Sequence, residues 1–156
     1  MRSSWRAPGL AWIVTSSLTL SLTSSLSSPA HAQADRPVAC GDTLAQPGRA
    51  VIAADGLQLA HAPSAWPLPV GRPFGLDIVL CPASTASTAL PPLLQVDADM
   101  PAHRHGLNYR VALRQTGPGR YRAEGVLLHM PGRWRLVFDL GPAEAPRRLV
   151  RVVDVE

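Results

Sequence analysis

The 156-residue sequence contains no lysine, so all 15 of its basic residues are arginines, against 11 aspartates and glutamates. These arginines are spaced along alternating segments of the chain and form no basic run. A domain that binds phosphate backbones usually gathers its cations on one face. The composition therefore gives no support for a nucleic-acid partner.

Long apolar runs are also missing after the first thirty-odd residues, whereas a transmembrane helix needs about 20 predominantly apolar residues. The chain starts with a basic segment, continues through an uncharged apolar stretch over 9–26, and then carries small residues at Ala30 and Ala32. This order is typical of a secretory signal peptide. We expect 1–32 to be a signal peptide that is cleaved after Ala32. The remaining 33–156 would be a periplasmic or secreted protein with no stable membrane span. The alternative is an uncleaved amino-terminal anchor.

Cysteine is scarce, and the two that occur, Cys40 and Cys81, both follow the expected cleavage site. An even number of thiols in an exported protein favours a disulfide. The alternative, a metal-binding or redox-active pair, lacks the usual C-x-x-C spacing. We therefore expect a structural bridge between the two cysteines.

No amphipathic helix pattern and no internal repeat follow the signal peptide. Apolar residues instead alternate with polar ones between turns rich in proline and glycine, most clearly in 74–80, 94–100 and 134–140. Such alternation is typical of half-buried strands. We expect an all-β, immunoglobulin-like β-sandwich of about seven strands over 50–156. An N-terminal arm over 33–49 would precede it.

The alternation also predicts which side chains face the core. Leu94 has the same parity as Val96, and Leu127 has the same parity as Ala123, so both leucines are expected inside. Asp139 has the opposite parity to its apolar neighbours and is expected on a solvent face.

Catalytic signatures are absent from the sequence. A serine or cysteine nucleophile needs a base and an orienting group within hydrogen-bond reach, and no motif of that kind occurs. There is also no glycine-rich phosphate loop that opens a helix. We therefore expect a protein without enzymatic activity.

Two short clusters of methionine and histidine stand at expected strand ends. The first contains Met100, His103 and His105, and the second contains His129 and Met130. Thioether sulfur and imidazole are soft ligands that suit copper, and they remain available in an oxidising compartment. We expect Met100, His103, His105 and Met130 to bind copper where the two strand ends meet, with His129 as a reserve donor.

Each of these residues also has a structural interpretation. Strand alternation places Met100 on the core side, where it would cap the core, and His129 on the same face as Leu127. Met130 would pack beneath the turn at Pro131. A lone H-x-H is a weak motif. On this interpretation the protein is an interaction module without a metal, which docks a periplasmic protein partner through the loop end or a sheet edge.

Three motifs occur in a fixed order within about 66–140. They are Asp99-Met100-Pro101-x-His103-x-His105-Gly106, Gly119-x-Tyr121-x-Ala123-x-Gly125, and Met130-Pro131-Gly132-x-Trp134. Taken together, this ordered set resembles the YtkA-like family, which is related to FixH-type accessory domains. The resemblance implies an exported or membrane-anchored immunoglobulin-like sandwich with no established catalytic activity.

The resemblance also bears on function, because FixH-type proteins are associated with the assembly of copper-containing respiratory oxidases. It implies an accessory role in copper or cytochrome maturation. Leu107 departs from the pattern, since many relatives carry methionine after H-x-H-G. The motifs have structural explanations too: Gly106 and Gly132 suit backbone with positive φ, and Trp134 suits the space between two sheets.

Overall fold

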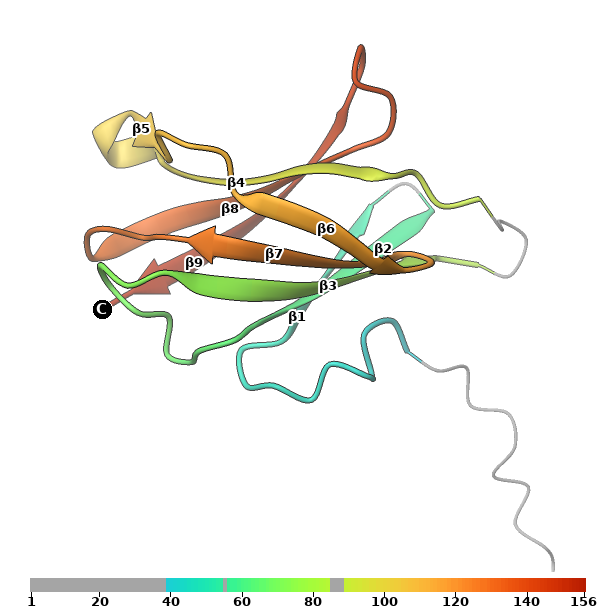
Figure 1. Cartoon of the computed structure of the whole chain (residues 1–156), viewed down its shortest axis with the longest axis horizontal. Helices are drawn as coiled ribbons and strands as arrows, with labels where there is room; N and C mark the ends of the chain where they lie inside the picture. Colours follow the sequence, from blue (N-terminus) through green and yellow to red (C-terminus); the bar gives the residue numbers. More distant parts are fainter. Residues whose placement is uncertain (1–38, 55, 85–88) are drawn as a thin grey trace, which may run out of the picture. The chain divides into compact units, whose positions relative to one another are not determined.

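The computed structural model of the protein describes residues 39–54, 56–84 and 89–156. Within these residues nine strands and one short 3-10 helix form two antiparallel sheets that pack against each other (Figure 1). The predicted all-β sandwich is therefore confirmed. The expected signal peptide, 1–32, lies outside the described residues. No helix in the described part of the chain has the length and hydrophobicity that a membrane span requires.

Each sheet is built from neighbours that run antiparallel. The larger sheet has, in spatial order, β1 (Ala50–Ala54), β2 (Leu57–Pro63), β3 (Phe74–Pro82), β7 (Arg120–Val126) and β6 (Ala112–Gly117). The smaller sheet has β5 (His105–Gly106), β4 (Leu93–Met100), β8 (Gly132–Leu140) and β9 (Arg147–Val155). The strand count exceeds the expected seven partly because the two-residue β5 follows a turn that carries no strand pattern.

The core lies between the two sheets because period-2 alternation turns one face of each strand inward. Its largest members with no measurable exposure are Trp134 and Phe138 from β8, Leu59 from β2 and Leu76 from β3. The expected position of Trp134 between the sheets is confirmed. Full burial of a large apolar side chain contributes about 1.5–3 kcal/mol, so each of these residues adds substantially to the stability of the sandwich.

Two of the predicted core positions were wrong, and a β-bulge explains each. The register of β4 against β8 shifts between Leu93 and Gln95, which leaves Leu93 buried and Leu94 39% exposed. The register of β3 against β7 shifts as well, near Gly125, whose φ is +85°. An extra residue reverses the facing of all that follow, so Leu127 lies outside the core.

Asp139 also differs from its expected place on a solvent face, because it is only 8% exposed. Its two carboxylate oxygens accept hydrogen bonds from Nε and Nη2 of Arg148 on β9, at 2.8 and 2.9 Å. A bidentate guanidinium of this kind compensates a carboxylate for lost hydration. Arg148 of the neighbouring strand thus shields Asp139 from solvent, which strand alternation alone does not predict.

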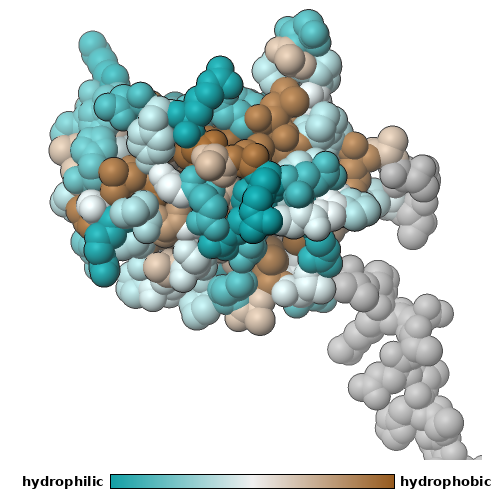
Figure 2. All heavy atoms as spheres, viewed as in Figure 1, coloured by the Kyte–Doolittle hydropathy of each residue, from teal (hydrophilic) through white to brown (hydrophobic). Residues whose placement is uncertain are grey.

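The outer surface of the sheets carries arginine–carboxylate pairs across neighbouring strands. Arg135 binds Asp99 through two hydrogen bonds, at 2.6 and 2.7 Å, and Arg122 lies 2.9 Å from Asp77. Figure 2 shows hydrophilic side chains spread over the viewed face with hydrophobic ones between them. The cations are dispersed and partly neutralised, as their spacing in the sequence indicates.

The segment before β1 is bound to the outer face of the larger sheet. A disulfide joins Cys40 to Cys81 at the end of β3, which confirms the predicted bridge. Cys40 and Leu44 form a second, smaller apolar cluster with Ala60, Ala62 and Val79. The bridge therefore fixes residues 39–49 against β2 and β3.

Candidate functional site

The chain reverses direction directly after β4. A 3-10 turn, Pro101–His103, is followed by Arg104 in the left-handed region with φ +55°. This turn brings β5 back antiparallel to β4, so that His105 is the register partner of Met100. The tight return therefore sets the first histidine motif at the end of the smaller sheet.

The second motif follows β7. Figure 1 shows β5 and the connection between β7 and β8 at the same end of the sandwich. In that connection Leu128 is buried and forms a bridge with Val70, whereas the next residue, His129, is exposed. The carbonyl of Met130 accepts a hydrogen bond from the indole N–H of Trp134 at 3.0 Å. A buried tryptophan thus holds this connection in place.

Three imidazole rings lie in series at this end of the molecule. The ring centroids of His105 and His129 are 4.8 Å apart, and those of His103 and His105 are 5.8 Å apart. The indole of Trp134 meets His105 at 5.6 Å and His129 at 5.3 Å, both edge to face. We call His103, His105, His129 and Trp134 the histidine cluster.

The three histidines differ in exposure. His103 and His129 are exposed, while His105 is half-buried. The Nδ1 atom of His105 is buried and has no hydrogen-bond partner in the described residues. A buried polar atom without a partner is uncommon in native proteins and calls for an explanation such as a bound ion or water molecule. The central ring of the histidine cluster therefore has a free donor or acceptor position.

A hollow of about 420 Å³ lies beside the histidine cluster, and its lining includes His105, Tyr109, Leu127 and His129. The hydroxyl of Tyr109 donates a hydrogen bond to the carbonyl of Gly125 at 2.6 Å, which fixes the phenol at the rim. Two of the three imidazoles are thus accessible to a small solute from one side.

The two methionines have different surroundings. Met100 is only 2% exposed and belongs to the main core, and a Cβ added at Gly132 would lie 2.6 Å from its Cε. Met130 is half-buried and packs against the edge of that core. The structure thus brings the three histidines together, including the reserve donor His129, while the thioether of Met100 lies inside the sandwich.

The two motif glycines are required for different reasons. Gly132 has φ +124°, as predicted. Gly106 does not lie in the positive-φ region, so that part of the prediction was wrong. A Cβ on Gly106 would lie 2.9 Å from the carbonyl oxygen of Ala98, so the requirement there is close approach of two backbones. The positive φ in this loop belongs to Arg104.

A metal at this end would have to be held by few ligands. Among the described residues, no three histidine, cysteine, aspartate or glutamate side chains are grouped so that together they could hold a metal ion. The donors that fit best are His105, with its unpartnered Nδ1, and His129, the nearest imidazole. Met130 follows His129 directly in the chain. Binding of copper by the five expected residues stays a prediction.

One further histidine, His61, was not among the predicted site residues. His61 on β2 is 2% exposed and neither of its ring nitrogens has a hydrogen-bond partner in the described part of the chain. Burial, helped by the charge of Arg151, lowers its pKa to about 4, so the ring is neutral at neutral pH. A signal existed in the sequence, because His61 has the same parity as the core residues Leu57 and Leu59.

Comparisons of the chain with protein-family models, with curated proteins and with solved structures found no match. The resemblance to the YtkA-like family therefore stays a prediction.

Proposed function

We propose that the protein is an exported, periplasmic accessory protein that binds copper at the histidine cluster and supports copper or cytochrome maturation. The observation that carries the proposal is the meeting of His105 and His129, with ring centroids 4.8 Å apart and an unpartnered, buried Nδ1 on His105. The disulfide between Cys40 and Cys81 supports an oxidising compartment.

The donor set favours copper over harder ions. Imidazole binds copper and zinc well, and thioether sulfur selects Cu(I). Two imidazoles and a neighbouring thioether from Met130 would give a soft site with few ligands, which Cu(I) accepts. Calcium and magnesium instead prefer several oxygen ligands, and the acidic residue near this end, Asp99, is already paired with Arg135.

Trp134 would shape such a site without binding the metal through a heteroatom. Its N–H is occupied by the Met130 carbonyl, and its ring contacts both His105 and His129. The indole would therefore position both imidazoles and exclude water from one side.

The test is an anaerobic Cu(I) competition titration of the purified protein, with Cu(II) and Zn(II) run in parallel. We expect one tightly bound equivalent of Cu(I) that is lost in the double variant His105→Ala/His129→Ala. His103→Ala should weaken binding less, because its ring is the more distant neighbour of His105. Arg110→Ala, an exposed change in the adjacent loop, is the control and should bind as the unmodified protein does.

The contrary result is equal binding by the unmodified protein and the double variant. The histidine cluster would then have a structural role. The function to test next would be the docking of a periplasmic protein partner without a metal, and the same variants would serve in a pull-down with candidate partners.

A further inference from the structure

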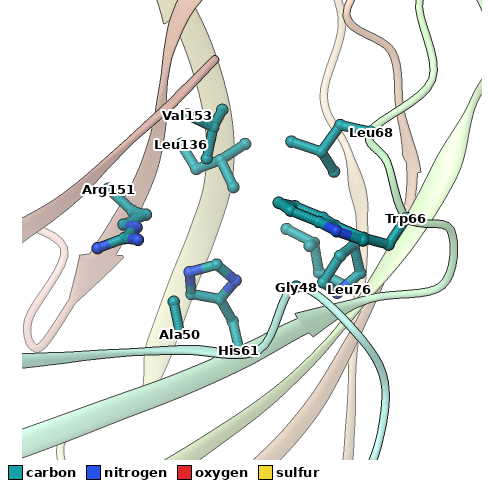
Figure 3. A pocket seen from close by; sticks show the side chains of 10 residues that line it. Gly48, Ala50, His61, Trp66, Leu68, Leu76, Leu136, Arg151 and Val153 are labelled. Atoms are coloured by element: carbon teal, nitrogen blue, oxygen red, sulfur yellow. The ribbon is translucent and has the colours of Figure 1, made fainter. Parts of the chain in front are cut away.

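A second site with unused polar groups lies away from the histidine cluster. It is a cavity of about 30 Å³ between the β1–β2 edge of the larger sheet and β9 of the smaller one, which are not paired with each other. Figure 3 shows His61 and Arg151 on one side of it and Trp66, Leu68, Leu136 and Val153 around the rest. The proposed copper site uses none of these residues.

His61 is the buried polar group of this cavity. Its side chain is 98% removed from solvent, because the residue is 2% exposed, and both ring nitrogens lack partners within the described residues. One face of the ring lies against Phe138, with centroids 5.4 Å apart. A neutral imidazole has one N–H donor and one acceptor, and burying both without a partner is unfavourable. The cavity is the side from which a partner can reach them.

Arg151 gives the cavity a positive charge. It is exposed on β9, and it forms no ion pair or side-chain hydrogen bond with another residue in the described part of the chain. Most other arginines on the same sheet are paired with carboxylates, as Arg133, Arg135 and Arg148 are. The single unpaired guanidinium beside a neutral imidazole favours a ligand that carries one negative charge.

The remaining walls are apolar. Trp66 is 54% exposed and lies at the mouth, where its indole covers Gly48 so closely that no Cβ could fit there. In Figure 3 Leu68 lies beside the indole, and Leu136 and Val153 lie across the cavity from it. A ligand that enters past Trp66 therefore meets apolar surface before it reaches the buried His61.

The size of the cavity limits the polar part of the ligand. A volume of 30 Å³ has room for about two water-sized groups, since each needs roughly 10–15 Å³. The two oxygens of a carboxylate meet that limit. A phosphate, with four oxygens and up to two charges, exceeds both the volume and the single cation. Two ordered water molecules are the competing occupants.

We propose that this cavity binds the carboxylate of a small organic acid with an apolar tail. One carboxylate oxygen accepts the N–H of His61, the other pairs with the guanidinium of Arg151, and the tail lies along Trp66. The cavity has room for the carboxylate alone, and the apolar tail lies outside it against the half-exposed Trp66.

The test uses butyrate as the probe and butyramide, its uncharged counterpart, as the matched control ligand. Amide chemical shifts of ¹⁵N-labelled protein are followed during titration with each. We expect saturable shifts at Ala50, His61 and Val153 with butyrate and none with butyramide. Arg151→Met keeps most of the stem and should weaken butyrate binding by about tenfold or more, as expected for loss of a hydrogen bond to a charged group. His61→Phe keeps an aromatic ring at this position and should also weaken butyrate binding.

Arg114→Met removes another exposed arginine, from β6 in the other sheet, and should leave butyrate binding unchanged. Because Arg151 is at the surface, its variant keeps the test valid if His61→Phe fails to fold. Three results would overturn the proposal. These are no saturable shift with butyrate, equal binding of butyrate and butyramide, or equal butyrate affinity of Arg151→Met and the unmodified protein. The first would mean that water alone occupies the cavity.

Discussion

The His61 cavity and the histidine cluster place imidazole rings in opposite environments. His61 projects from a seven-residue strand into the core, where its surroundings are apolar except for Arg151. His105 and His129 lie on a two-residue strand and a connection, contact one another, and face a solvent-accessible hollow. The first arrangement presents a single neutral imidazole, whereas the second presents several nitrogens together.

This contrast shows that position in the sandwich determines what a histidine can do. Inside the sheet, strand alternation separates polar side chains and burial suppresses their charge. At the strand ends, reversing loops bring side chains from distant parts of the sequence within contact distance. The proposed copper site and the proposed carboxylate site follow from these two settings.

The largest difference in stability between the two regions is expected when the tryptophan of each region is replaced by alanine. Trp134→Ala removes a fully buried ring that supports the histidine cluster and should lower the free energy of unfolding by about 3–5 kcal/mol. Trp66→Ala, at the mouth of the His61 cavity, removes a half-exposed ring and should lower it by less than about 1 kcal/mol. Urea denaturation measures both. Equal losses would show that the two rings do not differ in burial as described.

Removal of the disulfide should loosen the His61 side of the molecule more than the histidine cluster. Cys40→Ala/Cys81→Ala releases a bridge between residues 41 positions apart and should lower the free energy of unfolding by about 2–4 kcal/mol. Residues 39–49, which include Gly48 of the cavity wall, should lose hydrogen-exchange protection. Amides near His105 and His129 should lose no more protection than the lower global stability causes. Equal additional loss at both sites would mean that the two regions are not independent.

Lowering the pH should weaken the folded state through His61. The pKa of the folded side chain is lowered to about 4, while the unfolded value is about 6.5. Between these values the unfolded chain binds the proton and the folded chain does not, so stability falls as pH falls and levels off below about 4. The expected loss from this residue is about 3 kcal/mol. His61→Phe should lack it, and an unchanged pH slope in that variant would contradict the assignment.

A smaller loss is expected at the turn that follows the second motif, where β8 begins. Gly132 has φ +124°, and a Cβ there would lie 2.6 Å from Cε of Met100. Gly132→Ala should therefore lower the free energy of unfolding by about 1–2 kcal/mol. Gly56→Ala offers a control with positive φ and no neighbour within 4 Å of the added Cβ. Equal losses in the two variants would leave backbone strain as the sole cause.

Much of the sandwich could be predicted because alternation and turn residues report directly on strands. The buried Trp134 and the Cys40–Cys81 bridge both followed from local patterns. Leu94 and Leu127 were assigned to the wrong face because a β-bulge inserts one residue and leaves no clear trace in a hydrophobic pattern. Burial of Asp139 depends on Arg148 of the neighbouring strand, which strand parity does not include.

The candidate site could be predicted only in part. The motifs selected the right residue types, but the pairing of His105 with His129 depends on two loops meeting in space. The burial of Met100 was foreseen as an alternative, because parity placed it with Val96 and Ala98. The His61 cavity could not be predicted, since it forms between β2 and β9, whose approach is set by tertiary packing.

The most direct test of the copper proposal is to observe the imidazole nitrogens themselves. Long-range ¹H–¹⁵N correlation spectra of the ¹⁵N-labelled protein would be recorded anaerobically before and after one equivalent of Cu(I), a diamagnetic ion. We predict that the ring nitrogens of His105 and His129 shift together while those of His61 stay unchanged. Unchanged His105 and His129 resonances, with copper left free in solution, would contradict a copper site at the histidine cluster.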